Sequence, residues 1–296
     1  MIKNHSFVGS NVALITPMFS DGRVDYESLN NLIDFHIDAG TSSIVSVGTT
    51  GESATVGVRE HLKIIDHTIK YAARRIPIIA GTGANSTSEA IELTQEAKNF
   101  GADACLLVTP YYNKPTQEGL FQHFKLIAES VNIDQILYNV PGRTAVDMSA
   151  DTTSRLSEIS NIIGIKDATG DLSVIKDLVA KCPEDFLLLT GDDATAIDFI
   201  LLGGHGGISV TANVTPKELQ KAYLAAIAGN AELAKKLNDE LSGLHKNLFI
   251  ESNPIPVKWA LHKMGKCDSG IRLPLLELSN QCRTILENDL KELGLI

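Results

Sequence analysis

A single lysine stands where an ammonium group would be costly. Lys166 directly follows the apolar run 162–165 within the stretch IIGIKDATGD, and this pattern is typical of the end of a buried strand. Surroundings of low dielectric favour the neutral amine, and a neutral amine can attack a ketone to form a Schiff base. For an isolated lysine, a solvated strand end would be the better interpretation. The position therefore favours Lys166 as a Schiff-base nucleophile.

The loop GTTGES (48–53) could bind a carboxylate. Its backbone N–H groups and the hydroxyls of Thr49 and Thr50 are suitable donors near the start of a helix, although an ordinary glycine turn would have the same composition. The loop lacks the lysine of a P-loop, and GTGANS (81–86) lacks the third glycine of a dinucleotide fingerprint. Nucleotide binding is therefore weakly supported.

The stretch YNVPGRT (138–144) carries two further candidates. Tyr138 is either a proton shuttle that faces the lysine or a core tyrosine. Arg143 is either a surface ion-pair partner or, in a loop beside the site, a planar group that binds a second carboxylate. In the second role, Arg143 would bind a carboxylate in addition to the one that the loop 48–53 could hold.

The histidines and cysteines predict no metal site. The eight histidines include no HExxH spacing, and the four cysteines include no CxxC pair. We interpret His123 and His205 as packing or solvent-facing residues. Since a lysine imine supplies its own activation, we expect neither a metal nor an organic cofactor.

The overall charge and the N-terminal stretch exclude several classes of protein. The formal net charge is −10 without a dense basic cluster, which argues against nucleic acid and anionic membranes as partners. The N-terminal stretch MIKNHSFVGSN lacks the apolar centre of a signal peptide, and no apolar run is long enough to cross a bilayer. The sequence predicts a cytoplasmic globular protein.

Eight apolar runs are expected to position these residues. Each is rich in Val, Ile or Leu and alternates with a longer amphipathic segment, as in parallel sheets buried on both faces. The order favours a (β/α)₈ TIM barrel over a doubly wound sheet, and barrel chemistry belongs to the loops after the strands. The predicted strands are residues 11–16, 42–47, 76–81, 102–109, 134–139, 161–166, 185–190 and 206–210.

Helical patterns lie between and after the strands. Segments 25–40 and 86–101 are two examples; in the second, Ser86 or Ser88 could cap the start and Gly101 the end. After residue 210 the pattern is purely helical, and no linker rich in Pro, Gly or Ser separates it. We predict a catalytic barrel domain over residues 1–226 and a C-terminal helical appendage over residues 227–296 that packs on it.

Six motifs occur in an order that is typical of one enzyme family. They are GTTGES, TPYYNKPTQEG, YNVPGRT, GIKDATGD, GGISVTANV and NPIPVKWAL. Together they resemble the dihydrodipicolinate synthase family, also called 4-hydroxy-tetrahydrodipicolinate synthase, over about residues 6–293. The resemblance implies a lyase of the class I aldolase type that condenses pyruvate with aspartate 4-semialdehyde, in diaminopimelate and lysine biosynthesis.

The same resemblance implies roles for individual residues. The catalytic residues would be Lys166, Tyr138, Thr49 and Tyr112, the last reaching in from an adjacent subunit. The substrate-binding residues would be Thr50 for the pyruvate carboxylate, Arg143 for the semialdehyde carboxylate, and Gly191 and Ile208 through their backbones. The shared site implies a homo-oligomer, a dimer or a tetramer built from dimers.

Relatives that L-lysine inhibits bind it in a cleft at the dimer interface. The matching positions are Ser53, Ala54, His61, Asn85, Glu89 and Tyr111. Val58 stands where lysine-sensitive relatives commonly have a histidine. We therefore expect partial inhibition by L-lysine, although these side chains could equally be ordinary interface residues.

Three alternatives remain open at this point. N-acetylneuraminate lyases and 2-keto-3-deoxy-sugar acid aldolases are similar in barrel, lysine and pyruvate site, but sugar acids call for neutral hydrogen-bonding groups where Arg143 stands. A pyridoxal phosphate barrel would also use a lysine imine. The last alternative is a barrel that binds a keto acid without turnover.

Overall fold

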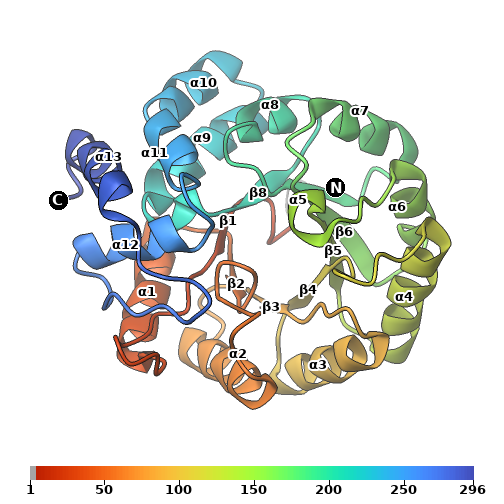
Figure 1. Cartoon of the computed structure of the whole chain (residues 1–296). Helices are drawn as coiled ribbons and strands as arrows, with labels where there is room; N and C mark the ends of the chain where they lie inside the picture. Colours follow the sequence, from red (N-terminus) through yellow and green to blue (C-terminus); the bar gives the residue numbers. More distant parts are fainter. Residues whose placement is uncertain (1–4) are drawn as a thin grey trace.

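The chain forms a closed barrel of eight parallel strands. The computed structural model describes residues 5–296, and in it each strand pairs with the next while β1 pairs with β8. Figure 1 shows the strands at the centre of a ring of helices. The strands are β1 (Gly9–Ala13), β2 (Ser43–Ser46), β3 (Ile78–Gly81), β4 (Ala104–Val108), β5 (Gln135–Asn139), β6 (Ile162–Asp167), β7 (Leu187–Thr190) and β8 (Gly206–Ser209). The predicted TIM barrel is confirmed.

The first strand differs from its prediction. It spans Gly9–Ala13 and not 11–16. The backbone N–H of Ile15 donates to Asn213 Oδ1 at 3.1 Å, so the chain has left the strand ladder by this residue. Ile15 nevertheless stays buried in the core, and the apolar pattern therefore continues beyond the end of the strand. Residues 1–4, which begin the predicted barrel domain and the N-terminal stretch without signal-peptide character, lie outside the described residues.

Nine helices are described up to the end of the barrel. They are α1 (Tyr26–Ala39), α2 (Val58–Ala72), α3 (Thr87–Phe100), α4 (Gln117–Ser130), α5 (Pro141–Thr144), α6 (Ala150–Leu156), α7 (Leu172–Lys181), α8 (Ala196–Leu201) and α9 (Pro216–Ile227). In α1 the Asp25 carboxylate accepts from the N–H groups of Glu27 and Ser28, and Gly40 ends the helix at φ 77°. This helix confirms the prediction over 25–40.

Helix α3 confirms one predicted end and corrects the other. Gly101 takes a left-handed conformation at φ 93° directly after the helix, as predicted. Ser86 occupies the N-cap position, but neither serine caps the helix through its side chain. The Ser86 and Ser88 hydroxyls instead lie 3.0 Å apart and hydrogen-bond to each other.

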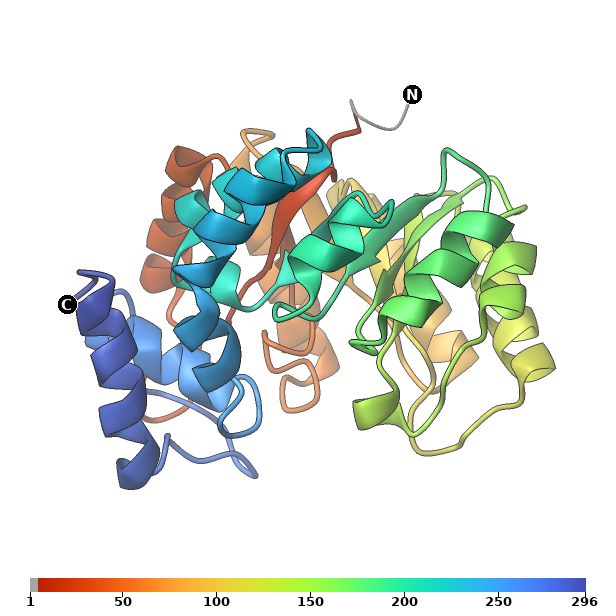
Figure 2. The same cartoon turned by 90° about the horizontal axis from the view of Figure 1, so that it is seen from above.

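The C-terminal region adds four helices on one side of the barrel. They are α10 (Ala231–Asp239), α11 (Ser242–Asn247), α12 (Ile255–Lys263) and α13 (Asn280–Glu292). Figure 2 shows α12 and α13 projecting beyond the barrel, away from the end at which β1 begins. This arrangement confirms the helical appendage, whereas the division into domains at residue 226 stays a prediction.

The prediction of purely helical structure after residue 210 is wrong for the connecting stretches, of which residues 264–279 are the longest. Residues 264–279 form no regular element. Gly265 is left-handed at φ 69° after α12, and Pro274 within the stretch has no N–H to donate, so both residues oppose a continuous helix. Among the described helices, none is long and apolar enough to cross a membrane.

Candidate active site

Lys166 lies near the carboxyl end of β6, beside Tyr138 of β5. The two residues are register partners, and Lys166 Nζ lies 4.2 Å from the centroid of the Tyr138 ring. Both side chains are only 6% exposed, and both line a cavity of about 400 Å³. The parallel register therefore places an amine and a phenol side by side in a space that suits a small substrate.

Gly191 gives the lysine side chain its room. A Cβ atom at this position would lie 2.6 Å from Lys166 Cε and 2.7 Å from Ala168 Cβ, both far inside ordinary carbon–carbon contact. The Gly191 N–H donates to Asp167 O at 2.6 Å, which holds the backbone at this close approach. The absent side chain thus allows Lys166 to pass beside the loop after β7.

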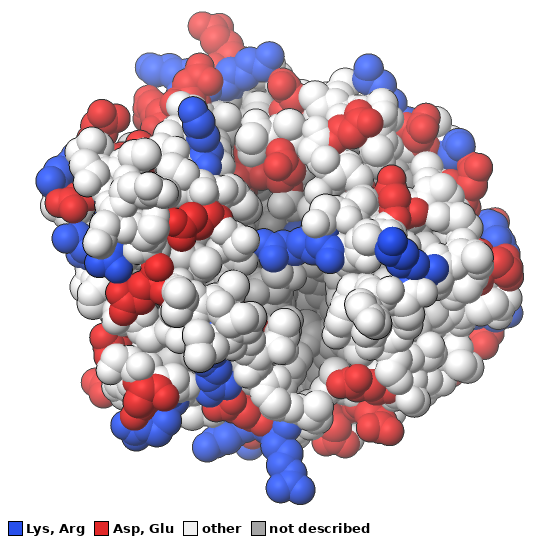
Figure 3. Space-filling view, in the orientation of Figure 1, with Lys and Arg blue, Asp and Glu red and all other residues white. Residues whose placement is uncertain are grey.

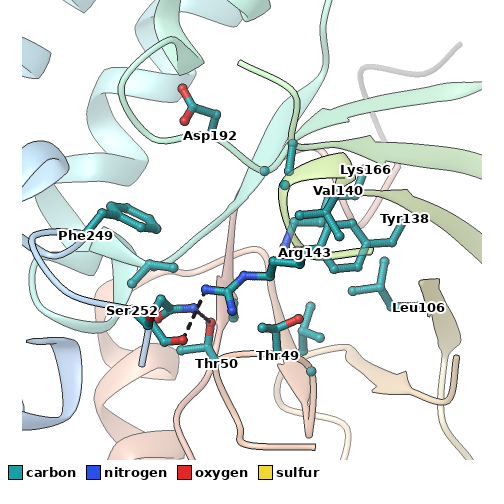
Figure 4. Close-up of a pocket in the computed structure, with 18 residues that line it drawn as sticks. Thr49, Thr50, Leu106, Tyr138, Val140, Arg143, Lys166, Asp192, Phe249 and Ser252 are labelled. Carbon is teal, nitrogen blue, oxygen red and sulfur yellow. Dashed lines mark hydrogen bonds between the residues drawn. The ribbon is translucent and has the colours of Figure 1, made fainter. Parts of the chain in front are cut away.

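Thr50 and Arg143 converge on one residue from the C-terminal region. Asn253 Nδ2 donates to Thr50 Oγ1 at 3.0 Å, and Arg143 Nη2 donates to the Asn253 carbonyl at 3.1 Å. Thr49 lines the cavity next to Thr50. Figure 4 shows Arg143 extending across the pocket, with Thr49 and Thr50 below it and Tyr138 behind. The geometry places a cationic group beside the hydroxyls that could hold an acid.

One part of the cavity wall comes from the C-terminal region, to which the sequence prediction assigns no site residue. Phe249, Ser252 and Asn253 line the cavity and come from the loop before α12. Asn253 begins the motif NPIPVKWAL, which is the one signal that could have indicated this wall. Figure 3 shows the same face hollowed at its centre, with a basic side chain across the hollow.

Two carboxylates near the lysine are already hydrogen-bonded. Asp167 is buried and accepts from Thr169 Oγ1 at 2.5 Å, and burial raises the pKa of this carboxyl against the opposing effect of its hydrogen bonds. Asp192 lines the cavity and accepts from the backbone N–H of Thr195 at 3.0 Å. Neither carboxylate is among the residues that the sequence predicts for the site.

Two residues predicted for the site do not line the cavity. Tyr112 is 90% exposed in the loop after β4, with a left-handed φ of 74°, and does not line the cavity of its own chain. Ile208 is buried among the inward-facing residues of the barrel together with Tyr138 and is not part of the cavity wall.

A second cavity, of about 290 Å³, adjoins the first. Of the six residues predicted to bind L-lysine, five line it: Ser53, Ala54, His61, Glu89 and Tyr111. Asn85 does not, but its Nδ2 donates to Tyr111 O at 3.2 Å. Val58 is also in the wall. The two cavities share Thr49, Val140 and Arg143, so they are separated by a single layer of side chains.

Burial shifts the pKa values of two polar side chains in the second cavity, His61 and Tyr111. His61 Nε2 lies 2.7 Å from Gly81 O, and burial lowers the pKa of its imidazole, with the hydrogen bond opposing this. Burial also raises the pKa of the Tyr111 phenol, with a further contribution from the charge of Glu89. These shifts favour a neutral histidine and a protonated tyrosine at neutral pH.

Over residues 5–296, no group of three or more His, Cys, Asp or Glu side chains is arranged to hold a metal ion. The four cysteines are unpaired, and Cys105, Cys267 and Cys282 are buried.

Comparison with known proteins assigns the family. Residues 6–293 match the Dihydrodipicolinate synthetase family, which is nearly the whole chain. The chain belongs to this family. The resemblance of the six motifs is thereby confirmed.

Similar proteins support the same assignment in sequence and in fold. The chain is 66% identical over 293 residues to the 4-hydroxy-tetrahydrodipicolinate synthase of Ruthia magnifica subsp. Calyptogena magnifica, covering 99% of both chains. It matches a chloride-inhibited dihydrodipicolinate synthase from Acinetobacter baumannii, solved with pyruvate, at a TM-score of 0.97 and 58% identity, covering 98% of this chain and 100% of that one. The synthase of Cyanidioschyzon merolae, solved with lysine bound, matches at a TM-score of 0.96 and 36% identity, covering 99% and 100%.

Proposed function

We propose that this protein is a 4-hydroxy-tetrahydrodipicolinate synthase, a lyase that condenses pyruvate with L-aspartate 4-semialdehyde. The observation that carries the proposal is the position of Lys166 Nζ, next to Tyr138 in a cavity that Arg143 also lines. A lysine in such a cavity suits imine formation with a keto acid, and an arginine at the mouth suits a second acid. The names of the family members and of the relatives support it.

The reaction begins with attack of the neutral Lys166 amine on the pyruvate ketone. The carboxylate of pyruvate is held by Thr50, and Tyr138 and Thr49 carry protons so that the carbinolamine loses water and becomes an imine. Loss of a methyl proton converts the imine into an enamine, whose terminal carbon is nucleophilic. No metal or organic cofactor is needed, because the protonated imine accepts the electron pair.

The second half of the reaction uses Arg143. The enamine carbon attacks the aldehyde, while the guanidinium holds the carboxylate of the semialdehyde. The semialdehyde amine then adds to the imine carbon and releases the Lys166 amine, so that the ring closes. One water is released overall, from the carbinolamine. A sugar acid would leave the charge of Arg143 without its partner, and this favours the synthase over the related aldolases.

Tyr112 completes the relay of a neighbouring subunit in this proposal. Its side chain is almost fully exposed, and the residue is held in a left-handed conformation, as is the nearby Lys114. Large exposed aromatic side chains are more typical of interfaces than of free surface. The protein is accordingly proposed to be a homodimer or a tetramer built from two dimers. A cytoplasmic location stays a prediction.

The second cavity is proposed to bind L-lysine. Glu89 supplies a carboxylate for an ammonium group, and Tyr111 supplies a hydroxyl for the ligand carboxylate. Binding would act on the site through the shared wall of Thr49 and Arg143 and through the sequence neighbour of Tyr111, Tyr112. Val58 offers no polar contact, so the inhibition is proposed to be partial.

Borohydride reduction tests the central step. The protein is incubated with pyruvate, reduced, digested and analysed by mass spectrometry, and a reduced pyruvate adduct is expected on Lys166. Adduct on another lysine, or no adduct, would contradict the proposed function. Turnover of the two substrates to product separates the synthase from a barrel that only binds a keto acid.

A further inference from the structure

A buried ion pair joins the C-terminal helices to the loop that carries Thr49 and Thr50. Lys258 of α12 donates to Glu52 Oε1, and the two side chains are 2% and 0% exposed. The other carboxylate oxygen, Oε2, accepts from the backbone N–H of Arg272 at 3.1 Å. Within residues 5–296, this is the one ion pair with both side chains buried.

The loop that carries Thr49 and Thr50 is under conformational strain. Val47 and Glu52, which flank residues 48–51, both take left-handed conformations, with φ of 53° and 60°. Such a conformation costs about 1–2 kcal/mol for a residue with a Cβ, so it persists only where other contacts hold it. One contact is the Thr16 hydroxyl, which donates to Gly51 O at 2.7 Å. The Glu52 carboxylate supplies two more, both to the C-terminal region.

Stability alone does not explain why this pair is charged. Desolvating two ions costs about as much as their attraction returns, and apolar side chains of similar volume would fill the space at no loss. Burial lowers the pKa of the Lys258 amine, and the charge of Glu52 opposes this effect. A charged hydrogen-bonded pair does, however, fix one geometry, which apolar side chains do less well.

Helix α12 and its preceding loop hold the same segment at two places. Asn253 donates to Thr50 Oγ1, and Lys258 donates to Glu52, two residues further along. The hydroxyls of Thr49 and Thr50, which are proposed to bind pyruvate, belong to this loop. Neither Glu52 nor Lys258 lines the cavity itself. The pair therefore lies behind the site, where it can orient the loop without touching substrate.

We propose that Glu52 and Lys258 are positioning residues for the pyruvate carboxylate: their ion pair fixes the loop so that Thr49 and Thr50 face Lys166. This inference rests on the proposed function. It assigns to the C-terminal helices a part in the first half of the reaction, imine formation, and not in the binding of the semialdehyde.

The test compares imine formation in Glu52→Gln and Lys258→Met with that of the unaltered protein. The rate of borohydride-trappable adduct at Lys166 is measured at several pyruvate concentrations and divided by the folded fraction from circular dichroism. We expect the rate at low pyruvate to fall by about tenfold or more, because a misplaced binding group costs about this much, while the KM for the semialdehyde changes less than about threefold. Glu287→Gln is the control, since it breaks the partly exposed ion pairs of Glu287 with Lys263 and Lys291, outside the site, and should leave the rate unchanged.

The double variant Glu52→Gln/Lys258→Met separates positioning from stability. Removing both charges should return the unfolding temperature towards that of the unaltered protein, because no unpaired ion stays buried, while trapping remains slow. Recovery of the trapping rate together with stability would overturn the positioning role, as would single variants whose folded fraction traps at the normal rate. If a single variant does not fold, the double variant alone decides. Failure of the unaltered protein to trap pyruvate would instead remove the proposed function, and the positioning role with it.

Discussion

Gly191→Ala is expected to slow imine formation through one added methyl group. The new Cβ would lie 2.6 Å from Lys166 Cε, and carbon atoms prefer about 3.5–4.0 Å, so the lysine must move by about 1 Å. The new Cβ would also lie 2.7 Å from Ala168 Cβ, a short side chain that cannot rotate away, and 3.3 Å from Lys166 Cγ, so rotating the end of the lysine does not relieve the whole clash. A misplacement of about 1 Å costs about 10² in rate, which is about 2.7 kcal/mol in the barrier.

The assay is borohydride trapping with pyruvate alone, so that the semialdehyde has no influence on the measured rate. The expected result is a trapping rate about 10² lower than normal in a protein whose circular dichroism is unchanged. Gly57→Ala is the matched control, because a Cβ there meets nothing within 4 Å and its φ of −63° suits any residue. Trapping by Gly191→Ala within about threefold of the normal rate would refute the reasoning, since the lysine would then have another route to the ketone.

Three further outcomes follow from the site. Arg143→Ala should lower kcat/KM for the semialdehyde by about 10² or more, as expected for the loss of a bidentate charged contact, and should leave pyruvate trapping largely intact; equal loss in both measurements would contradict its role. Mixed Tyr112→Phe and Lys166→Ala subunits should regain turnover that neither parent shows, and a fully active monomer in sedimentation would exclude the shared site. L-Lysine should inhibit partially at low pyruvate and more strongly in Val58→His, whereas no response at millimolar concentration in either protein would leave the second cavity without this ligand.

The fold was largely predictable because strands buried on both faces leave a continuous apolar pattern. All eight runs became strands, and their order alone favoured the barrel. The errors arose where a residue is buried without belonging to a helix or strand. Ile15 is buried although it lies outside the strand ladder, and residues 264–279 include buried residues although they form no helix. Ser86 shows a further limit, because an N-cap residue can have a partner other than the helix.

Site residues could be predicted only where the residue type and its place in the sequence were informative without knowledge of its partner. The positions of Lys166 at the end of an apolar strand and of Arg143 in a loop at the same end of the barrel predicted that the two share a site, and both line the cavity. Glu52 and Lys258 could not be predicted, because each looks like an ordinary charged residue and 206 positions separate them in the chain. The same holds for Asn253, whose partner Thr50 is 203 positions away. Only the packing of α12 against the barrel brings these groups together.

The dependence of the site on its last helices has a consequence for protein synthesis. During translation the eighth strand ends at Ser209, and from then on all strands of the barrel are available to pair. Part of the cavity wall and the partner of Glu52 come from residues 249–258, which emerge later. A nascent chain that stalls between these points would hold a barrel with Lys166 in place and an unfinished loop. The proposed positioning role therefore implies that competence for pyruvate comes late, when most of the polypeptide has already been made.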